Sequence, residues 1–179
     1  MKESLRPKFK RKIKINGPVL LLIGPIGTFF ARLAQYLNKK NIKTYKISFP
    51  FFEYGFPSNS RIYFDKDIYL FKNFLKDLLI QQKIKHVFMY GNVLIPHRYA
   101  IDLIKTLNKD GLDIKCHIFE LGYLRPNFVT LEEYGVNYES GFLLERDFYL
   151  KQKPFFKYPV PKKQGMRLRK IWKVITFIK

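Results

Sequence analysis

The stretch from Pro18 to Leu37, PVLLLIGPIGTFFARLAQYL, decides how the chain begins to fold. Its first part, PVLLLI, is a short apolar run of the kind that forms a buried strand. GPIG follows from Gly24 to Gly27, and the apolar residues after it recur at helical spacing, with Thr28 placed to cap the helix. A strand, a glycine turn and a helix in this order predict the first unit of an α/β sheet, and they are one way in which proteins hold a phosphate.

The same alternation of strands and helices continues to about residue 120. Apolar or alternating runs predict strands, and amphipathic runs predict the helices between them. The predicted strands are 43–49, 61–64, 86–91 and 114–120, and the predicted helices are 67–83, with Asp67 as its cap, and 96–108. After Gly122 the pattern weakens into a turn-rich stretch. We therefore predict a doubly wound parallel sheet of the Rossmann-like α/β class.

In such a sheet the ligand sits at the carboxyl ends of the strands. Four segments lie at or directly after the ends of predicted strands, and all four are expected along this one edge. They are Gly24–Gly27, Ser48, Gly91–Asn92 and Glu120–Gly122. The sequence thus gathers its candidate site residues at one edge of the sheet.

Glu120 is the strongest candidate for chemistry, because it ends a predicted strand and is followed by Leu-Gly-Tyr. A carboxylate in that position can act as a general base or a nucleophile in glycosyl transfer. The alternative is an exposed glutamate at a strand end that has no chemical role.

The other candidates each have a structural alternative. GPIG lacks the Lys-Ser/Thr of a P-loop and the third glycine of a dinucleotide fingerprint, so it is equally a plain strand–helix turn. His97 follows Pro96 at a predicted helix start, where it donates to a phosphate or carboxylate, or is a capping or surface residue. Arg125 precedes Pro126, and it either holds an anion or pins its loop.

Metal sites and disulfides are not expected. The three histidines and the one cysteine have no metal-ligand spacing, and His86 and His117 are interpreted as core or strand residues. Cys116 lies within an apolar run, which predicts a buried, reduced thiol.

The net charge of +20 is concentrated at the two ends of the chain. Residues 1–14 hold seven Lys/Arg and one acidic residue, and residues 151–179 hold ten Lys/Arg and no acidic residue. We predict a basic amino-terminal arm (1–14), one α/β domain (15–150), and a basic linker with an amphipathic carboxyl-terminal helix (151–179). Such ends attract anionic lipid, nucleic acid or a charged glycan, or are simply solvated.

Three stretches carry a family resemblance: VLLLIGPIGTFFARLAQYL, the His-Arg pair at 97–98, and FELGYLRPNFVTLEEYGVN at 119–137. The third is the most specific, because it keeps Phe-Glu, then Gly-Tyr-Leu-Arg-Pro, Thr-Leu-Glu and Gly-Val-Asn in order. Together they resemble the capsule polysaccharide biosynthesis and export family of the KpsS/LipB type. The resemblance covers about residues 18 to 140.

This resemblance implies the amino-terminal domain of a two-domain GT-B glycosyltransferase. The implied reaction transfers Kdo, an acidic eight-carbon sugar, from CMP-Kdo to a phosphatidylglycerol-based acceptor, which builds the linker for capsule export. CMP-Kdo is the expected donor substrate, and no cofactor is expected. By resemblance Glu120 is the catalytic carboxylate, and the implied substrate-binding residues are Gly24, Pro25, Gly27, Asn92, His97, Arg98, Gly122, Tyr123 and Arg125.

The sequence also departs from the family pattern. The second acid of the acidic pair is Leu121, and Gly91–Leu94 stands where the family has Gly-Asp-Cys-Arg. Ser48–Glu53 stands where the family has Asn-Phe-Asn-Gly-Gly-Asp. The chain stops at Lys179, before the family's second domain, so we expect the chain alone to have no measurable transferase activity.

Two functional hypotheses follow. The first is a glycosyltransferase-type protein of capsule assembly, present as its amino-terminal half. The second is a non-catalytic binding module at the membrane surface. GMRLRKIWKVITFIK, from Gly165 to Lys179, fits either a helix on an anionic membrane or, as we favour, a helix that leads into a second domain. The expected partners are capsule assembly and export proteins, anionic inner-membrane lipid and a glycolipid acceptor, at a cytoplasmic, peripheral location; nucleic acid is not expected.

Overall fold

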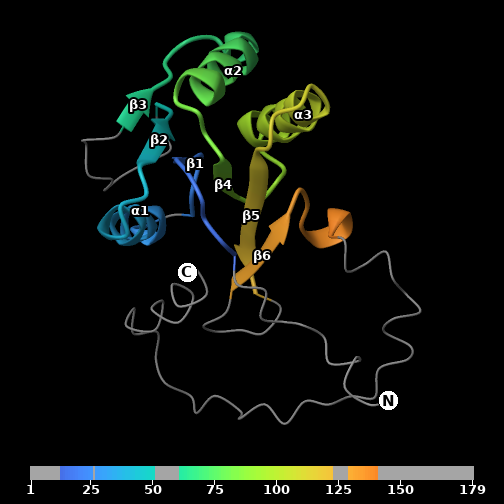
Figure 1. Cartoon of the computed structure of the whole chain (residues 1–179). Coiled ribbons are helices and arrows are strands. Elements are labelled where there is room, and N and C mark those ends of the chain that lie inside the picture. Colours follow the sequence, from blue (N-terminus) through green and yellow to red (C-terminus); the bar gives the residue numbers. More distant parts are fainter. Residues whose placement is uncertain (1–12, 26, 51–60, 123–128, 141–179) are drawn as a thin grey trace, which may run out of the picture.

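The computed structural model describes residues 13–25, 27–50, 61–122 and 129–140, which form one sheet with helices on both faces (Figure 1). The strands are β1 (Val19–Leu21), β2 (Thr44–Ser48), β3 (Arg61–Tyr63), β4 (His86–Tyr90), β5 (Lys115–Leu121) and β6 (Val129–Glu133). The helices are α1 (Phe29–Lys39), α2 (Phe71–Gln81) and α3 (Ile95–Lys109), with short 3-10 turns η2 (Ile68–Leu70) and η3 (Asn137–Glu139). The predicted Rossmann-like α/β class is confirmed.

The strand order β3-β2-β1-β4-β5-β6 places β1 near the middle of the sheet. The pairs from β3 to β5 are parallel, and Val19 of β1 stands opposite both Thr44 and His86. The chain therefore moves outward from β1 to β3 and then crosses back to β4. The direction of winding reverses at the β1–β4 junction, where sheets of this kind bind their ligands.

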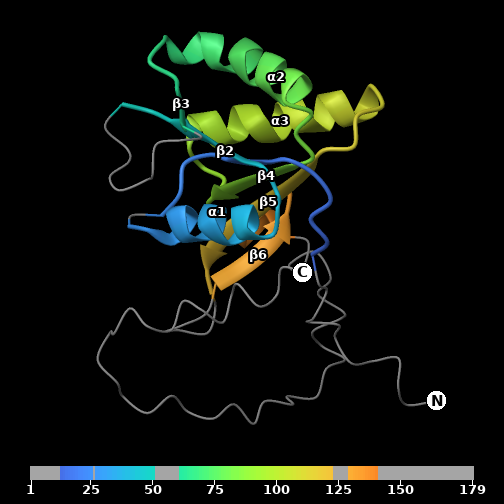
Figure 2. The ribbon, with the colours of Figure 1, turned by 60° about the vertical axis from the view of Figure 1, so that its left-hand side comes forward.

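The helices form a layer on each side of the sheet. Figure 2 shows α2 and α3 together on one side and α1 on the other. On the α1 side, Phe30, Leu33 and Leu37 pack with Phe88 and Phe119 of the sheet. Their spacing of three and four residues places them on one helix face, which explains why this segment folds as an amphipathic helix against the strands.

The sequence predictions for the helix caps are partly wrong. Thr28 occupies the N-cap position of α1, but its side chain makes no capping hydrogen bond. Asp67 caps η2 rather than a long helix, by accepting a hydrogen bond from the Tyr69 N–H at 2.9 Å. The helix α2 begins after this turn, at Phe71, and ends at Gln81.

Strand β6 is the element that the sequence did not predict. It runs antiparallel to β5, and Thr130 stands opposite Glu120. Its sequence, VTLEE, has no continuous apolar run from which a strand could be predicted, and only Glu132 of the five residues is buried. Pairing with β5 forms this strand, whereas the other strands are indicated by their own residues.

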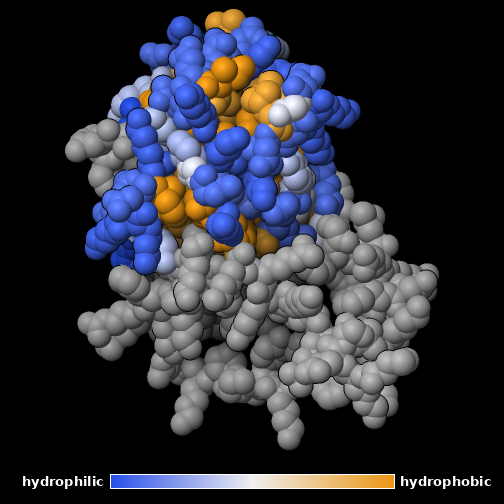
Figure 3. Space-filling model, viewed as in Figure 1, coloured by the Kyte–Doolittle hydropathy of each residue, from blue (hydrophilic) through white to orange (hydrophobic). Residues whose placement is uncertain are grey.

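The predicted domain limits at residues 15 and 150 stay predictions, and the basic segments 1–12 and 151–179 lie outside the described residues. Within the described part of the chain, no helix is long and apolar enough to cross a membrane. Figure 3 shows one face of this part, on which hydrophilic residues surround smaller hydrophobic patches.

Candidate functional site

The candidate site lies at the carboxyl edge of the sheet, as the sequence predicts. Strands β1, β2, β4 and β5 are parallel, so the residues after them emerge at the same edge. Gly24, Ser48, Gly91 and Glu120 all belong to this edge. In the structure, some of the residues at this edge contact one another, whereas others have a role in the packing of the fold.

The glycine turn after β1 packs against the first turn of α1. A Cβ at Gly24 would lie 2.8 Å from the Phe30 ring, which is closer than a real Cβ can approach. The neighbouring Phe29 ring meets Phe119 of β5 edge-on, with 5.1 Å between ring centroids. Gly27 has φ +104 and open space around it. Gly24 is thus required by packing, and Gly27 by its backbone conformation.

The loop between β4 and α3 forms a polar cluster with η3. Asn92 is 1% exposed, and its amide donates a hydrogen bond to the carboxylate of Glu139. Arg98, on the first turn of α3, forms an ion pair with the same carboxylate. Glu139 therefore joins two of the residues predicted to bind substrate, and it holds the 3-10 turn against the start of α3.

Glu120 stands beside this cluster, near the end of β5. Its Oε1 accepts a hydrogen bond from the Leu121 N–H at 2.8 Å, and its Oε2 accepts one from Asn137 Nδ2 at 3.4 Å. A Cβ built on Gly91 would lie 3.8 Å from Oε2, so the carboxylate faces the loop after β4. The carboxylate is half-buried, which leaves part of it accessible from the edge.

His97 lies on the first turn of α3, and its ring is buried inside the protein. It is therefore neither a surface residue nor the cap of the helix, which is Leu94. It is 0% exposed, and neither ring nitrogen has a hydrogen-bond partner among the described residues. Burial lowers the pKa of the ring to about 4. The backbones of Gly91 and Ile23 act to raise this pKa, and Lys46 lowers it further. At neutral pH the ring is therefore uncharged, and it cannot attract an anion as a cation does.

Lys46 of β2 is a buried cation that the sequence analysis missed. It is 1% exposed, and its ammonium group donates to the carbonyl oxygens of Leu22 at 2.8 Å and Ile47 at 2.6 Å. Leu22 follows β1, so Lys46 reaches the junction at which the winding reverses. The signal in the sequence is the alternation Thr44, Lys46, Ser48, which places three buried polar residues on one face of a strand.

Glu139 and Asn137 were also missed as site residues. Both lie on η3, and Asn137 has φ +57, a conformation that asparagine tolerates better than most residues. Asn137 was quoted only as the end of the Gly-Val-Asn motif. No local periodicity marks either residue, because each acquires its role through contacts with segments far away in the chain.

The remaining sequence candidates directly follow β5, at positions 122, 123 and 125. Tyr123 and Arg125 lie outside the described residues, and Gly122 is buried at the end of β5. No group of three metal-binding side chains exists among the described residues. Cys116 is a buried free thiol, as predicted, and burial raises its pKa to about 12, which keeps the thiol protonated at neutral pH.

The arrangement offers one accessible carboxylate, Glu120, supported by an amide donor and placed next to a buried polar cluster. Such a carboxylate can accept a proton from a hydroxyl group that binds at the edge. The glycine at position 91 leaves room beside it. Proton abstraction from a bound hydroxyl is therefore the chemistry that this edge supports best.

Comparison with known proteins shows that this chain is similar to capsule polysaccharide proteins. A family described as "Capsule polysaccharide biosynthesis protein" matches residues 92–170. The chain is 32% identical over 158 residues to "Capsule polysaccharide modification protein LipB" of Neisseria meningitidis serogroup B, with 86% of this chain covered. It is 31% identical over 140 residues to "Capsule polysaccharide export protein KpsS" of Escherichia coli, with 74% of this chain covered. No solved structure matches significantly.

The matched region is a minor part of each relative. It spans 36% of LipB and 33% of KpsS, so the chain covers about a third of the length of these curated relatives. The family match begins at Asn92 and includes Arg98, Glu120 and Glu139, the residues that form or flank the polar cluster.

Proposed function

This chain belongs to the family of capsule polysaccharide biosynthesis proteins of the KpsS/LipB type, and we propose that it acts in glycosyl transfer during capsule assembly. The proposed donor is CMP-Kdo, and the proposed acceptor is a phosphatidylglycerol-based glycolipid. Glu120 is the proposed catalytic carboxylate. The α/β domain would then be the amino-terminal domain of a GT-B-type transferase.

In the proposed reaction the carboxylate of Glu120 accepts the proton of an acceptor hydroxyl. The hydroxyl oxygen forms a bond to the anomeric carbon of Kdo. The bond from that carbon to the phosphate oxygen of CMP breaks, and CMP leaves with the electron pair. The Asn137 amide, which donates to Oε2, orients the carboxylate during this step.

The observation that carries the proposal is the position of the Glu120 carboxylate. It is half-buried at the carboxyl edge, and its Oε2 faces Gly91, where any larger residue would take up space beside it. Leu121 stands where the family has a second acid, so Glu120 is the carboxylate of this pair that remains. The proposed chemistry therefore depends on a single side chain.

The first experiment measures binding of CMP-Kdo and of a Kdo oligosaccharide to the purified chain by ligand-observed NMR. We expect weak binding that Glu120→Gln reduces severalfold. Glu133→Gln is the matched control, because Glu133 is an exposed glutamate at the other end of the sheet, at the end of β6. Equal binding by all three proteins would contradict a site at Glu120.

The second experiment measures Kdo transfer by the same purified chain. We expect no measurable transfer, because one open sheet edge cannot hold donor and acceptor together and exclude water. Transfer that disappears in Glu120→Gln would confirm the catalytic role but contradict the expected inactivity of the isolated chain. Transfer that persists in this variant would remove Glu120 from the mechanism.

The second candidate function is a non-catalytic binding module of the capsule assembly machinery. Leu121 favours it, since this residue is 50% exposed where the family has an acid. The module would bind assembly or export proteins and the anionic inner membrane, on the cytoplasmic side. Lipid binding without any glycan binding would support this candidate over the transferase.

A further inference from the structure

The edge of the sheet opposite the candidate site carries most of the net charge of the described residues. Strands β2, β4 and β5 begin at this amino edge, and helices α1, α2 and α3 end there. We define the lysine edge as eight exposed lysines: Lys14, which precedes the pocket residue Ile15, and seven at these starts and ends, namely Lys39, Lys40, Lys43, Lys83, Lys85, Lys109 and Lys115. Three exposed acidic residues accompany them: Asp110, Asp113 and Glu133.

The rest of the described part is almost neutral, because it holds eight Lys/Arg and seven Asp/Glu residues. This uneven distribution of charge also affects His86, which is buried beneath the lysine edge. Burial is the main cause of the lowered pKa of His86; Lys115 and Lys85 lower this pKa further, while Asp113 raises it. The lysines thus produce a positive potential that extends into the protein beneath them.

The lysines form a two-dimensional array. Lys43, Lys85 and Lys115 follow the sheet across β2, β4 and β5, at about 4.8 Å for each strand. Lys39 and Lys40, at the carboxyl end of α1, continue the array on one side of the sheet. Lys83 and Lys109 extend it beyond α2 and α3 on the other side, so the charge covers all three layers of Figure 2.

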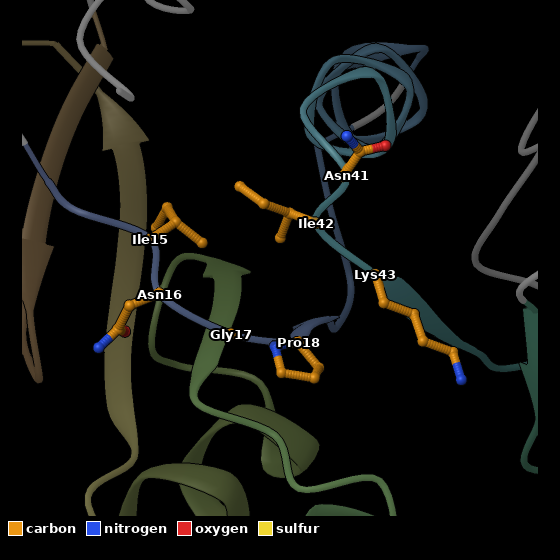
Figure 4. Close-up of a pocket in the computed structure, with 7 residues that line it drawn as sticks. All are labelled: Ile15, Asn16, Gly17, Pro18, Asn41, Ile42 and Lys43. Carbon is orange, nitrogen blue, oxygen red and sulfur yellow. The ribbon is translucent and has the colours of Figure 1, made fainter.

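A pocket of about 340 Å³, lined by both apolar and polar residues, opens within the same edge. Figure 4 shows Ile15 and Ile42 facing each other across it, with Lys43 beside them. The lysines and the partly buried side chain of Ile42 therefore face the same way. A bilayer surface offers partners for both, whereas a linear polyanion offers partners for the charge alone.

We propose that the lysine edge is the face that docks on an anionic phospholipid bilayer. The inference rests on the membrane association in the proposed function, and it adds which face makes the contact. A planar array of lysines fits a planar partner. Lysines, as flexible point charges, suit many phosphate headgroups without the fixed geometry that arginine recognises. In this orientation the carboxyl edge and Glu120 face away from the bilayer, so a lipid-anchored acceptor reaches Glu120 only through a glycan that extends past the sheet.

The test uses the full chain and vesicles of phosphatidylcholine with and without about one third phosphatidylglycerol. The edge variant is Lys43→Gln/Lys85→Gln/Lys115→Gln. The matched control is Lys66→Gln/Lys72→Gln/Lys76→Gln, which removes the same charge from three exposed lysines away from the edge. Cosedimentation gives the partition coefficient at about 0.05 M and about 0.3 M salt.

We expect the unmodified chain to bind only the anionic vesicles, more weakly at high salt. The edge variant should lose on the order of a hundredfold in partition coefficient, and the control much less. Lys43→Arg/Lys85→Arg/Lys115→Arg should restore binding, which excludes a folding defect at these positions.

The outcomes separate the two proposals. If the unmodified chain fails to bind anionic vesicles, the membrane association itself is wrong. If it binds but the edge and control variants lose affinity equally, only total charge matters and the docking face is wrong. If the edge variant loses affinity for duplex DNA or an acidic polysaccharide but not for vesicles, the edge serves a soluble polyanion, and the inference is overturned.

Discussion

The two edges of the same sheet have opposite chemistry. The carboxyl edge has a glycine in contact with an aromatic ring, a buried asparagine bound to Glu139, and a half-buried carboxylate at Glu120. The amino edge has exposed lysines over a stacked pair of buried histidines, His86 and His117, whose ring nitrogens lie 2.9 Å apart. Side chains at the first edge are fixed by their neighbours, and those at the second are mostly solvated.

This difference shows where substitution is tolerated. A fixed group cannot move without leaving a buried partner unsatisfied, whereas an exposed lysine is free to turn into solvent. The carboxyl edge can therefore hold a ligand in one geometry, which chemistry requires. The amino edge can present charge without a fixed geometry, which is sufficient for electrostatic attraction. The following predictions test this contrast, beginning with the largest expected effect.

Acid should destabilise the fold through its interior histidines, two of which lie at the amino edge. Burial lowers the pKa of His86 and His97 to about 4 and that of His117 to about 3. The unfolded chain therefore binds protons below about pH 6.5 that the folded chain does not. Stability is fully present above that pH, and at about pH 5 each histidine lowers the free energy of unfolding by about 2 kcal/mol. Urea unfolding followed by circular dichroism across this range measures the loss.

The His117→Phe variant distinguishes the contributions. The ring of His117 already stacks on Phe88, with 4.6 Å between centroids, so an aromatic replacement keeps the contact. The variant should lose about a third of the pH dependence between about pH 7 and about pH 5. An unchanged pH dependence would show that His117 is not protonated on unfolding in this range.

Removing Glu139 should weaken the carboxyl edge. Glu139→Ala takes away the acceptor of the buried Asn92 amide, and we expect a loss of about 1–3 kcal/mol in the free energy of unfolding. Most of this should come from Asn92, since Arg98 is 48% exposed and its ion pair with Glu139 is screened by water. A double-mutant cycle with Arg98→Ala measures the ion-pair share, and a coupling above about 1 kcal/mol would contradict this division.

The stability costs of two glycine-to-alanine variants, one at each edge, allow a direct comparison of the two edges. Gly24→Ala should cost about 1–3 kcal/mol, because the added Cβ would lie 2.8 Å from the Phe30 ring inside the core. Gly17→Ala at the amino edge brings its Cβ equally close to Lys85, at 2.7 Å. The clash is with the Cγ and Cβ atoms of Lys85, at 2.7 and 3.0 Å, which a change of the Lys85 χ1 rotamer relieves only in part. We therefore expect a cost of about 0.5–1.5 kcal/mol, smaller than that of Gly24→Ala. Equal thermal shifts for the two variants would refute the contrast between a fixed and an adaptable edge.

The smallest effect on stability is expected at the lysine edge itself. The triple variant of Lys43, Lys85 and Lys115 to glutamine should change the free energy of unfolding by less than about 0.5 kcal/mol for each site. The direction should be stabilising at low salt, because repulsion among the lysines is relieved. Unfolding at low and high salt measures this, and a salt-independent destabilisation would indicate that these side chains have a packing role.

The sequence predicted the elements whose own residues follow the period of a strand or a helix. The segment from Val19 to Leu37 gave β1 and α1 because its apolar residues follow the periods of a strand and a helix. Strand β6 was missed because it forms by pairing with β5 and lacks an apolar run of its own. Thr28 was expected to cap α1 from its residue type alone, but its side chain makes no such bond.

The candidate site shows the same division. Glu120 and Asn92 were named because each lies at or directly after the end of a predicted strand, and Arg98 was named because the His-Arg pair carries the family resemblance. Glu139 was not, because its role comes from bonds to residues that are 41 and 47 positions away in the chain. His97 was named as a residue for anion binding, yet its position inside the protein keeps its ring neutral at pH 7.

The sequence by itself determined the α/β alternation, the edge at which the candidate site residues gather and the family to which the chain belongs. Periodicity, glycine turns and motif order are properties of short segments, and they can be read without knowing what packs against them. Only the tertiary structure decided that Lys46 and His97 are buried, that Glu139 joins Asn92 to Arg98, and that lysines from three layers meet at one edge. Each of these depends on which distant segments the parallel strand order brings together, and no local pattern encodes that order.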